Sequence, residues 1–374
     1  MDDSVLFETV SCAAGKAIGI ATLNRPKTLN GLSLEMTRLL DQPLEKWVSD
    51  DQIVAVVLKG AGEKAFCAGG DLHGLYHAMQ EHQGRPAQEN KLVCDFFAEE
   101  YALDYSIHTY PKPIVCWGDG IVMGGGMGLM AGASHRVVTE TSRLAMPEIS
   151  IGLFPDVGGS WLLARAPGRT GIFLGLTGAQ LGASDAIFAG MADHAVNRDQ
   201  WPVFLHAVSQ QAWLGRYDDF QAMTDVLTSL VSPALAPGPL RQHFDTIQQT
   251  CEGYELENIA QRVAALATHD DTWLARAGQT FVAGCPATAR LTWILWRCAR
   301  QLSLAQVFQL EWGVAIECAA QGNFQEGIRA VLIDKDRNPQ WKPPTLSETR
   351  GQWNAPYFSV AIDDPTHPLI RLGV

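Results

Sequence analysis

The chain has no feature that would tie it to a nucleic acid, a membrane or a disulfide framework. Its 374 residues carry 28 basic and 40 acidic side chains, a net charge of −12, and no run of Lys and Arg long enough to track a phosphate backbone. No apolar stretch is long enough to span a bilayer, and the eight cysteines form neither a CxxC pair nor a His-rich ligand spacing. We therefore expect no nucleic acid partner, no membrane partner, no metal site and no disulfide framework.

The N-terminus lacks the marks of a targeting segment. It begins Met-Asp-Asp-Ser, without the basic start and apolar run of a secretory signal or the Arg-rich amphipathic pattern of a transit peptide. The scattered cysteines are typical of thiols that stay reduced. Together these observations predict a cytoplasmic protein.

The order of apolar patterns predicts an α/β fold. Strand-like segments at 17–23, 53–58 and 114–117 alternate with helical patterns at 33–47 and 91–109. A chain of this length that is 47% hydrophobic buries a large core without covalent staples. We expect an α/β core over residues 1–200, a C-terminal helical region over 201–345 and an irregular tail over 346–374.

Two glycine-rich loops, at 67–71 and 123–127, each follow a buried strand and precede a helix. Glycine lets the backbone approach a ligand closely, and a helix N-terminus leaves N–H groups free to hold negative charge. One N–H from each loop on a single carbonyl oxygen would form an oxyanion hole, in which removing one donor typically costs about 10²–10³ in rate. Each loop alone is better explained as a tight turn, but the pair favours a ligand site. Neither matches a nucleotide-binding or serine-hydrolase motif.

Two acids, Glu148 and Asp156, lie in a segment broken by proline and glycine, so a turn rather than a helix must bring them together. Each also has a structural explanation: Glu148 as a surface carboxylate, and Asp156 as the N-cap of a helix beginning near Gly159. Glu100 falls on the apolar stripe of the 91–109 helix, where it is either an ion-paired buried acid or part of the site.

Four segments, in this order along the chain, resemble the crotonase (enoyl-CoA hydratase/isomerase) superfamily: Asn24-Arg-Pro-Lys-Thr-Leu-Asn30, Ala65-Phe-Cys-Ala-Gly-Gly-Asp71, Gly120-Ile-Val-Met-Gly-Gly-Gly-Met127 and Met146-Pro-Glu-Ile-Ser-Ile-Gly152. The resemblance implies a spiral core of stacked ββα units with a C-terminal helical region, commonly assembled as a homo-trimer or hexamer. It also implies an acyl-CoA substrate whose thioester carbonyl is held by the N–H groups of Gly70 and Gly125. It implies no cofactor beyond the coenzyme A of the substrate, and no metal.

Within the superfamily the chain is most similar to hydrolases that cleave short hydroxyacyl-CoA thioesters, above all 3-hydroxyisobutyryl-CoA in valine breakdown. This similarity is carried by Phe97-Ala-Glu-Glu-Tyr101, by Phe154-Pro-Asp156 and by Glu326-Gly-Ile-Arg-Ala-Val-Leu-Ile-Asp-Lys-Asp336. Two departures from the hydrolase pattern, Asn323 and the Glu-Trp-Gly segment at 311–313, bear on specificity or packing.

Two positions separate the hydrolases from the hydratases. Hydratases carry two catalytic glutamates, of which the later corresponds to Glu148 and the earlier falls on Gly128 in this chain. Hydratases also usually have glycine where this chain has Asp156. Hydration of an alkene needs one group to deliver water and another to manage the proton, so the loss of one acid disfavours it.

The resemblance implies a role for each site residue. Glu148 would be the nucleophile or the general base, two alternatives that stay open. Asp156 would bind the 3-hydroxyl group and help to protonate the thiolate or to position water, and Glu100 would line the acyl pocket. Coenzyme A would lie along Lys27, Leu29, Ala68, Asp71 and Leu72. The alternatives are an enoyl-CoA hydratase or isomerase, and a non-catalytic acyl-CoA-binding protein.

Overall fold

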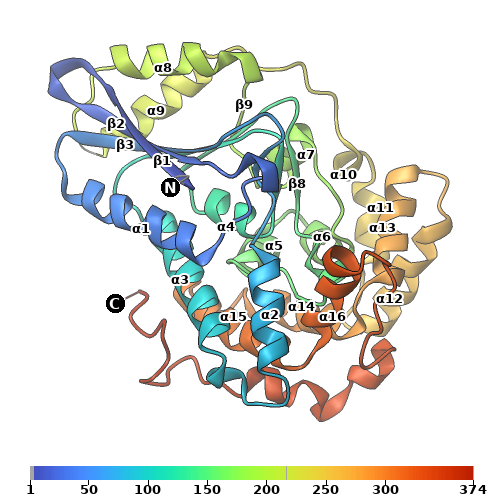
Figure 1. Cartoon of the computed structure of the whole chain (residues 1–374). Helices are drawn as coiled ribbons and strands as arrows, with labels where there is room; N and C mark the ends of the chain where they lie inside the picture. The colour runs from blue at the N-terminus through green and yellow to red at the C-terminus, as the bar shows by residue number, and fades with distance from the viewer. Residues whose placement is uncertain (1–3, 216, 374) are drawn as a thin grey trace. The chain divides into compact units, whose positions relative to one another are not determined.

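The structure is a computed structural model that describes residues 4–215 and 217–373 (Figure 1). The chain forms two compact units, each built from separate stretches of sequence. The first unit comprises Met1–Gly70, Leu103–Leu144 and Leu181–Gly238, and the second comprises Asp71–Ala102, Ala145–Gln180 and Pro239–Val374. The two units interleave along the chain. The expected division at residues 200 and 345 stays a prediction.

The first unit is built on a mainly parallel six-stranded sheet. Its strands, in spatial order, are β1 (Val5–Ser11), β2 (Ala17–Leu23), β3 (Ile53–Gly60), β5 (Ile114–Gly118), β7 (His135–Val138) and β9 (His194–Ala195). Only the β1–β2 pair among these is antiparallel. A smaller three-stranded sheet contains β4 (Ala65–Cys67), β6 (Ile121–Met123) and β8 (Arg143–Ala145). The expected α/β class is confirmed.

The strand sequences explain this arrangement. Residues 53–58 are all buried, as expected for a strand covered on both faces of a parallel sheet. One layer of cover comes from α8 (Trp201–Gln210) and α9 (Asp218–Ser229), whose Phe204 and Met223 join the core formed by β2 and β3 (Figure 1). The same unit contains α1 (Leu34–Ser49), α4 (Gly125–Ala131) and α7 (Ala183–Phe188). The expected N-cap of α1 is present, since the Ser33 side chain accepts the Met36 N–H at 3.2 Å.

The second unit is mostly helical. Its helices are α2 (Leu72–Glu81), α5 (Gly159–Arg165), α6 (Thr170–Thr177), α10 (Pro239–Gln242), α11 (Phe244–Thr250), α12 (Leu256–Ala265), α13 (Thr272–Ala283), α14 (Pro286–Cys298), α15 (Leu304–Ala320) and α16 (Asn323–Ile328). Helix α3 (Lys91–His108) runs from this unit into the first. Helix α15 packs against α5, and α16 packs against the 3₁₀ turn Glu148–Ile151. These contacts place two C-terminal helices beside the acids identified in the sequence.

No helix in the described part of the chain is long and apolar enough to cross a lipid bilayer. Within the same residues no group of three or more His, Cys, Asp or Glu side chains is placed to hold a metal ion. All eight cysteines are free thiols.

Candidate active site

The two glycine-rich loops lie against each other in the first unit. Residue 70 follows strand β4, and Gly125 is the first residue of α4, so its N–H is one of those with no acceptor inside the helix. A side chain on Gly126 would collide with the backbone of Cys67, and one on Gly69, whose φ is +118°, would stand 3.6 Å from the Met123 carbonyl oxygen. The close approach at Gly126 requires glycine, whereas at Gly69 the positive φ favours glycine.

The segment expected to contact coenzyme A is tied to the first of these loops. The Ala68 N–H donates to the Leu29 carbonyl at 3.0 Å, and residues 32 and 70 form a β-bridge. Buried Asn30 holds the turn, because its side-chain amide donates to the Ala61 and Ala65 carbonyls at 3.0 and 2.9 Å. Lys27 is exposed on this turn. The structure thus brings Leu29 and Ala68 together.

The remaining two residues of the expected coenzyme A contact lie at the start of α2. Asp71 occupies the N-cap position of that helix and Leu72 is its first residue. Both belong to the second unit by sequence.

The acids gather in the second unit. Glu148, Asp156 and Glu100 are each at most 4% exposed, which excludes the surface explanation for Glu148. The Tyr101 hydroxyl donates to Oδ2 of Asp156 at 2.7 Å. Among the described residues, one carboxyl oxygen of Glu148 and one of Glu100 are buried without a hydrogen-bond partner, and Glu100 has no Lys or Arg partner. Buried polar atoms are nearly always satisfied, so these oxygens are positioned to meet a ligand or water.

Burial and mutual repulsion set the pKa values of these acids. Burial raises the pKa of the Glu148 carboxyl well above its ordinary value, and the charge of Asp156 raises it further. The same two causes, in the same order, raise the pKa of Glu100. Burial also raises the pKa of Asp156 to about 6, against the lowering effect of the hydrogen bond from Tyr101. Asp156 therefore ionises first, and its charge keeps the proton on Glu148.

A further buried acid, Glu311 of α15, holds the turn that follows Asp156. It is fully buried, and its two carboxyl oxygens accept the N–H groups of Gly158 at 2.7 Å and Ser160 at 2.9 Å. Burial raises the pKa of Glu311 to about 8, although these hydrogen bonds oppose the shift. Helix α5 is thus capped by Glu311 from another helix, and not by Asp156.

From the sequence, Glu311 was interpreted only as part of the segment 311–313 that bears on specificity or packing, although a more specific signal was present. It stands on a helix with many apolar neighbours, among them Phe308, Trp312 and Ala315, which the structure buries. A carboxylate in the middle of an apolar helix needs partners, and that rule identifies it as structurally important.

Asn323, one of the two departures from the hydrolase pattern, has a packing role. Its amide exchanges hydrogen bonds with the Lys342 backbone, donating to the carbonyl at 2.6 Å and accepting the N–H at 2.9 Å. A side chain on Gly152, which has a φ of +74°, would collide with the Asn323 backbone. The first unit contains the two glycine loops and the second contains the buried acids, residue types that carbonyl-activating enzymes use.

Comparison with known proteins identifies the family. The model of the enoyl-CoA hydratase/isomerase family matches residues 18–358. A protein of Xenopus tropicalis named 3-hydroxyisobutyryl-CoA hydrolase, mitochondrial, is 36% identical over 96% of this chain and 89% of its own. The chain belongs to the enoyl-CoA hydratase/isomerase family, as its motifs indicated.

Two solved structures share the fold over nearly the whole chain. An enoyl-CoA hydratase from Rhodobacter sphaeroides superposes with a TM-score of 0.81 at 36% identity, covering 98% of this chain and 99% of its own. A carnitinyl-CoA dehydratase from Mycobacterium thermoresistibile gives a TM-score of 0.83 at 35% identity, covering 97% and 98%. The expected crotonase fold is confirmed.

The prediction of a cytoplasmic location is wrong, as the comparison with curated relatives shows. The curated relatives that are 34–38% identical to this chain are named as mitochondrial proteins. The prediction rested on the opening residues and on the scattered cysteines, and thiols describe the folded body of a protein. They carry no compartment address, because addresses are read by receptors from short signals.

Proposed function

We propose that this protein hydrolyses a short hydroxyacyl-CoA thioester, 3-hydroxyisobutyryl-CoA, to 3-hydroxyisobutyrate and coenzyme A, a step of valine breakdown. The observation that carries the proposal is Asp156, a buried acid held by Tyr101 beside Glu148. The name of the Xenopus tropicalis relative supports the same substrate.

The N–H groups of Gly70 and Gly125 hold the thioester oxygen in this proposal. They polarise the carbonyl in the substrate and stabilise the oxyanion of the tetrahedral intermediate. The close contact of the two glycine loops supports a shared task for them. Coenzyme A lies along the turn at 27–31 and the segment 67–72.

Glu148 acts in its ionised form. It either attacks the carbonyl carbon, so that the C–S bond breaks and a mixed anhydride forms, or removes a proton from the attacking water. Its raised pKa makes the ionised carboxylate a stronger base than an exposed glutamate. Water completes either route, by opening the anhydride or by direct addition.

Asp156 binds the 3-hydroxyl group and passes a proton to the departing thiolate or positions water. A pKa of about 6 suits a group that gains and loses a proton near neutral pH. Glu100, with its unpartnered buried oxygen, lines the acyl pocket. The reaction needs no metal or redox cofactor, so turnover is expected to survive dialysis against a chelator.

The test is thiol release from 3-hydroxyisobutyryl-CoA by the wild type, Glu148→Gln and Asp156→Asn. We expect losses of about 10²–10⁴ in rate for each variant, the usual contribution of a catalytic acid or base. Glu317→Gln serves as the matched control, because Glu317 lies on α15 but is half-buried and its side chain accepts a hydrogen bond from Gln321 at 3.2 Å. Undiminished turnover in both acid variants overturns the proposal.

Hydration of enoyl-CoA is the second candidate, because a structure titled as an enoyl-CoA hydratase is 36% identical. Against it stands Gly128, a buried residue that offers no side chain where hydratases carry their second glutamate. Crotonyl-CoA hydration measures this activity directly, and the loss of conjugated-thioester absorbance monitors it.

In solution we propose a homo-trimer or hexamer, which sedimentation analysis would test.

A further inference from the structure

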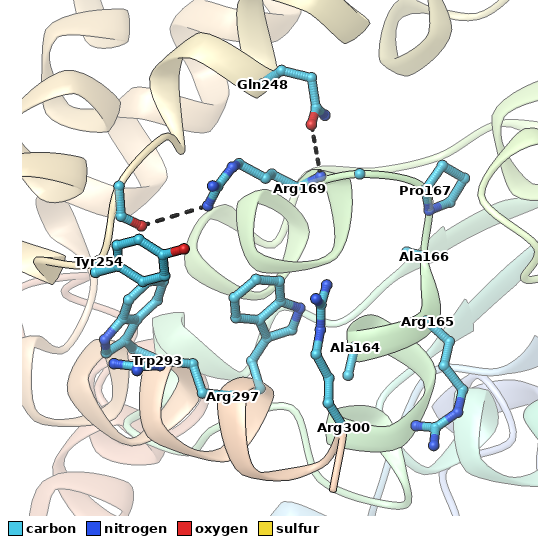
Figure 2. A pocket seen from close by; sticks show the side chains of 13 residues that line it. Ala164, Arg165, Ala166, Pro167, Arg169, Gln248, Tyr254, Trp293, Arg297 and Arg300 are labelled. Atoms are coloured by element: carbon cyan, nitrogen blue, oxygen red, sulfur yellow. Dashed lines mark hydrogen bonds between the residues drawn. The ribbon is translucent and has the colours of Figure 1, made fainter.

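A cavity of about 710 Å³ in the second unit has an unusual charge for this acidic chain. Thirteen residues line it, four of them arginines and none of them Asp or Glu (Figure 2). The arginines are Arg165, Arg169, Arg297 and Arg300. The chain as a whole has a net charge of −12, so a cavity with four cations and no acid is a local reversal of sign.

Two helix ends build the cationic wall. Trp293, Trp296 and Arg297 follow one another at helical spacing on α14, and Arg300 continues the same face just beyond the end of that helix. Arg165 is the last residue of α5. Figure 2 shows Arg300 directed into the cavity and the guanidinium of Arg165 turned away from it.

The guanidinium groups of Arg297 and Arg300 lie over aromatic rings and are not paired with carboxylates. Arg300 lies 4.7 Å from the ring centre of Trp296, and Arg297 lies 5.5 Å from that of Trp293. The two indoles stack on each other with centres 5.7 Å apart. In the described part of the chain, neither arginine forms an ion pair with Asp or Glu. Flat guanidinium groups fixed on rings keep their N–H groups available for bidentate binding of phosphate.

Stabilisation of the helix end accounts for only part of this arrangement. Cations near the C-terminus of a helix interact favourably with its dipole, which explains one arginine at the end of α14. The same effect accounts for Arg165 at the end of α5, but it does not explain why the two helix ends bring Arg165 and Arg300 so close that, after burial, the charge of Arg300 lowers the pKa of Arg165. Cations brought close enough to repel one another, without an acid between them, indicate a site for an anion.

The cavity also offers an aromatic surface. Tyr254, in the turn between α11 and α12, lines it and is 78% exposed. An exposed ring beside phosphate-binding arginines suits the planar base of a nucleotide. The volume lies within the range of small-molecule sites, about 300–1,000 Å³.

We propose that this cavity binds a phosphorylated nucleoside, with its phosphates on Arg297 and Arg300 and its base against Tyr254. The site is separate from the proposed hydrolysis, because none of its lining residues is assigned to the thioester or to coenzyme A there. A free nucleotide such as ADP and the nucleotide end of a coenzyme A molecule share this chemistry.

The test is calorimetric titration of the full chain with ADP, with coenzyme A and with pyrophosphate. The double variant Arg297→Ala/Arg300→Ala is expected to weaken ADP binding at least about tenfold, the usual effect of losing charge-assisted hydrogen bonds. The double variant Arg297→Lys/Arg300→Lys keeps the charge without the planar fork, and its ADP affinity should fall between those of the wild type and the double alanine variant. Arg276→Ala, an exposed arginine outside the cavity, is the control and should bind as the wild type does.

Thioester turnover measured without added nucleotide reports whether each variant is folded, and we expect it to be unchanged. Coenzyme A distinguishes the sources, because its affinity falls in the double variant only if its nucleotide end also enters this cavity. Equal ADP affinity in the wild type and the folded double variant overturns the proposal, since any binding then occurs elsewhere.

Tyr254→Ala tests separately whether the nucleoside base stacks on this side chain. It should weaken ADP several-fold and leave pyrophosphate binding unchanged, because only ADP carries a ring to stack. Unaltered ADP affinity in this variant contradicts the assignment of a nucleoside to the cavity.

Discussion

The hydroxyl of Tyr101 donates a 2.7 Å hydrogen bond to the carboxylate of Asp156, and both side chains are at most 4% exposed. This contact stabilises the charged form of an acid that burial would otherwise keep protonated. Asp156 in turn raises the pKa of Glu148. The tyrosine on α3 thereby influences the ionisation of both acids.

Tyr101→Phe removes the donor without changing the shape of the side chain. The pKa of Asp156 should rise above about 6, since the hydrogen bond lowers it. We also expect a loss of about 1–2 kcal/mol in the free energy of unfolding, the usual cost of one buried hydrogen bond. Urea unfolding and the pH dependence of kcat measure the two effects, and an unchanged pH profile would contradict the first.

Asp156→Asn should stabilise the folded protein at neutral pH while impairing turnover. The pKa of Asp156 is about 6 in the folded state against an ordinary value of 3.8, so the folded state binds the proton more tightly. Wild-type stability therefore decreases as pH rises from about 4 to about 6, and the variant lacks this loss. The variant should be up to about 3 kcal/mol more stable at pH 7. Urea unfolding at pH 4 and pH 7 tests this, and no difference at pH 7 would refute it.

The acidic limb of the pH–rate profile should lie well above the ordinary pKa of glutamate. Glu148 must be ionised to act, and burial and the charge of Asp156 raise its pKa. Asp156→Asn removes that charge and so lowers the pKa of Glu148. The acidic limb of the residual activity should therefore shift to lower pH. Measurement of kcat/KM between pH 5 and 9 for both proteins decides the point, and a shift to higher pH would count against the coupling.

Glu311→Gln should disturb the turn that carries Asp156. An amide offers only one acceptor oxygen for the N–H groups of Gly158 and Ser160, leaving one buried donor unsatisfied at a cost of about 1–3 kcal/mol. We expect a lower kcat with little change in KM, because Glu311 holds the turn without touching coenzyme A in our proposal. Glu317→Gln on the same helix is the control. A change confined to KM would show that the turn serves binding instead.

Asn30→Ala should weaken acyl-CoA binding. The Asn30 side chain makes three hydrogen bonds, accepting the Arg25 N–H at 2.9 Å and donating to the Ala61 and Ala65 carbonyls. Their loss should cost several kcal/mol of stability and let the turn at 27–31 move. The expected signature is a raised KM with a smaller change in kcat, and an unchanged KM in a folded variant would argue against a coenzyme A contact at this turn.

Local pattern was enough to predict several of the longer elements. The apolar run at 53–58, the Ser33 cap and the glycine loops after β4 and β6 are properties of short sequence windows, and the structure has each of them. The burial of Glu100 on its helical stripe was also readable from spacing.

Contacts between distant residues could not be predicted in this way. Tyr101 meets Asp156 from 55 positions away, and Glu311 meets Gly158 from 153. No periodicity encodes such pairs, since they arise from helix packing in three dimensions. For this reason Asp156 was a reasonable N-cap candidate in the sequence, although the structure gives that role to Glu311.

In the proposed function, Glu148 and Asp156 serve thioester cleavage in preference to hydration. The most direct measurement is the ratio of kcat/KM for thiol release from 3-hydroxyisobutyryl-CoA to kcat/KM for hydration of crotonyl-CoA, on one enzyme preparation. We expect a ratio far above one in the wild type, and loss of hydrolysis in Glu148→Gln. A ratio below one, or hydrolysis that persists in the variant, would contradict it.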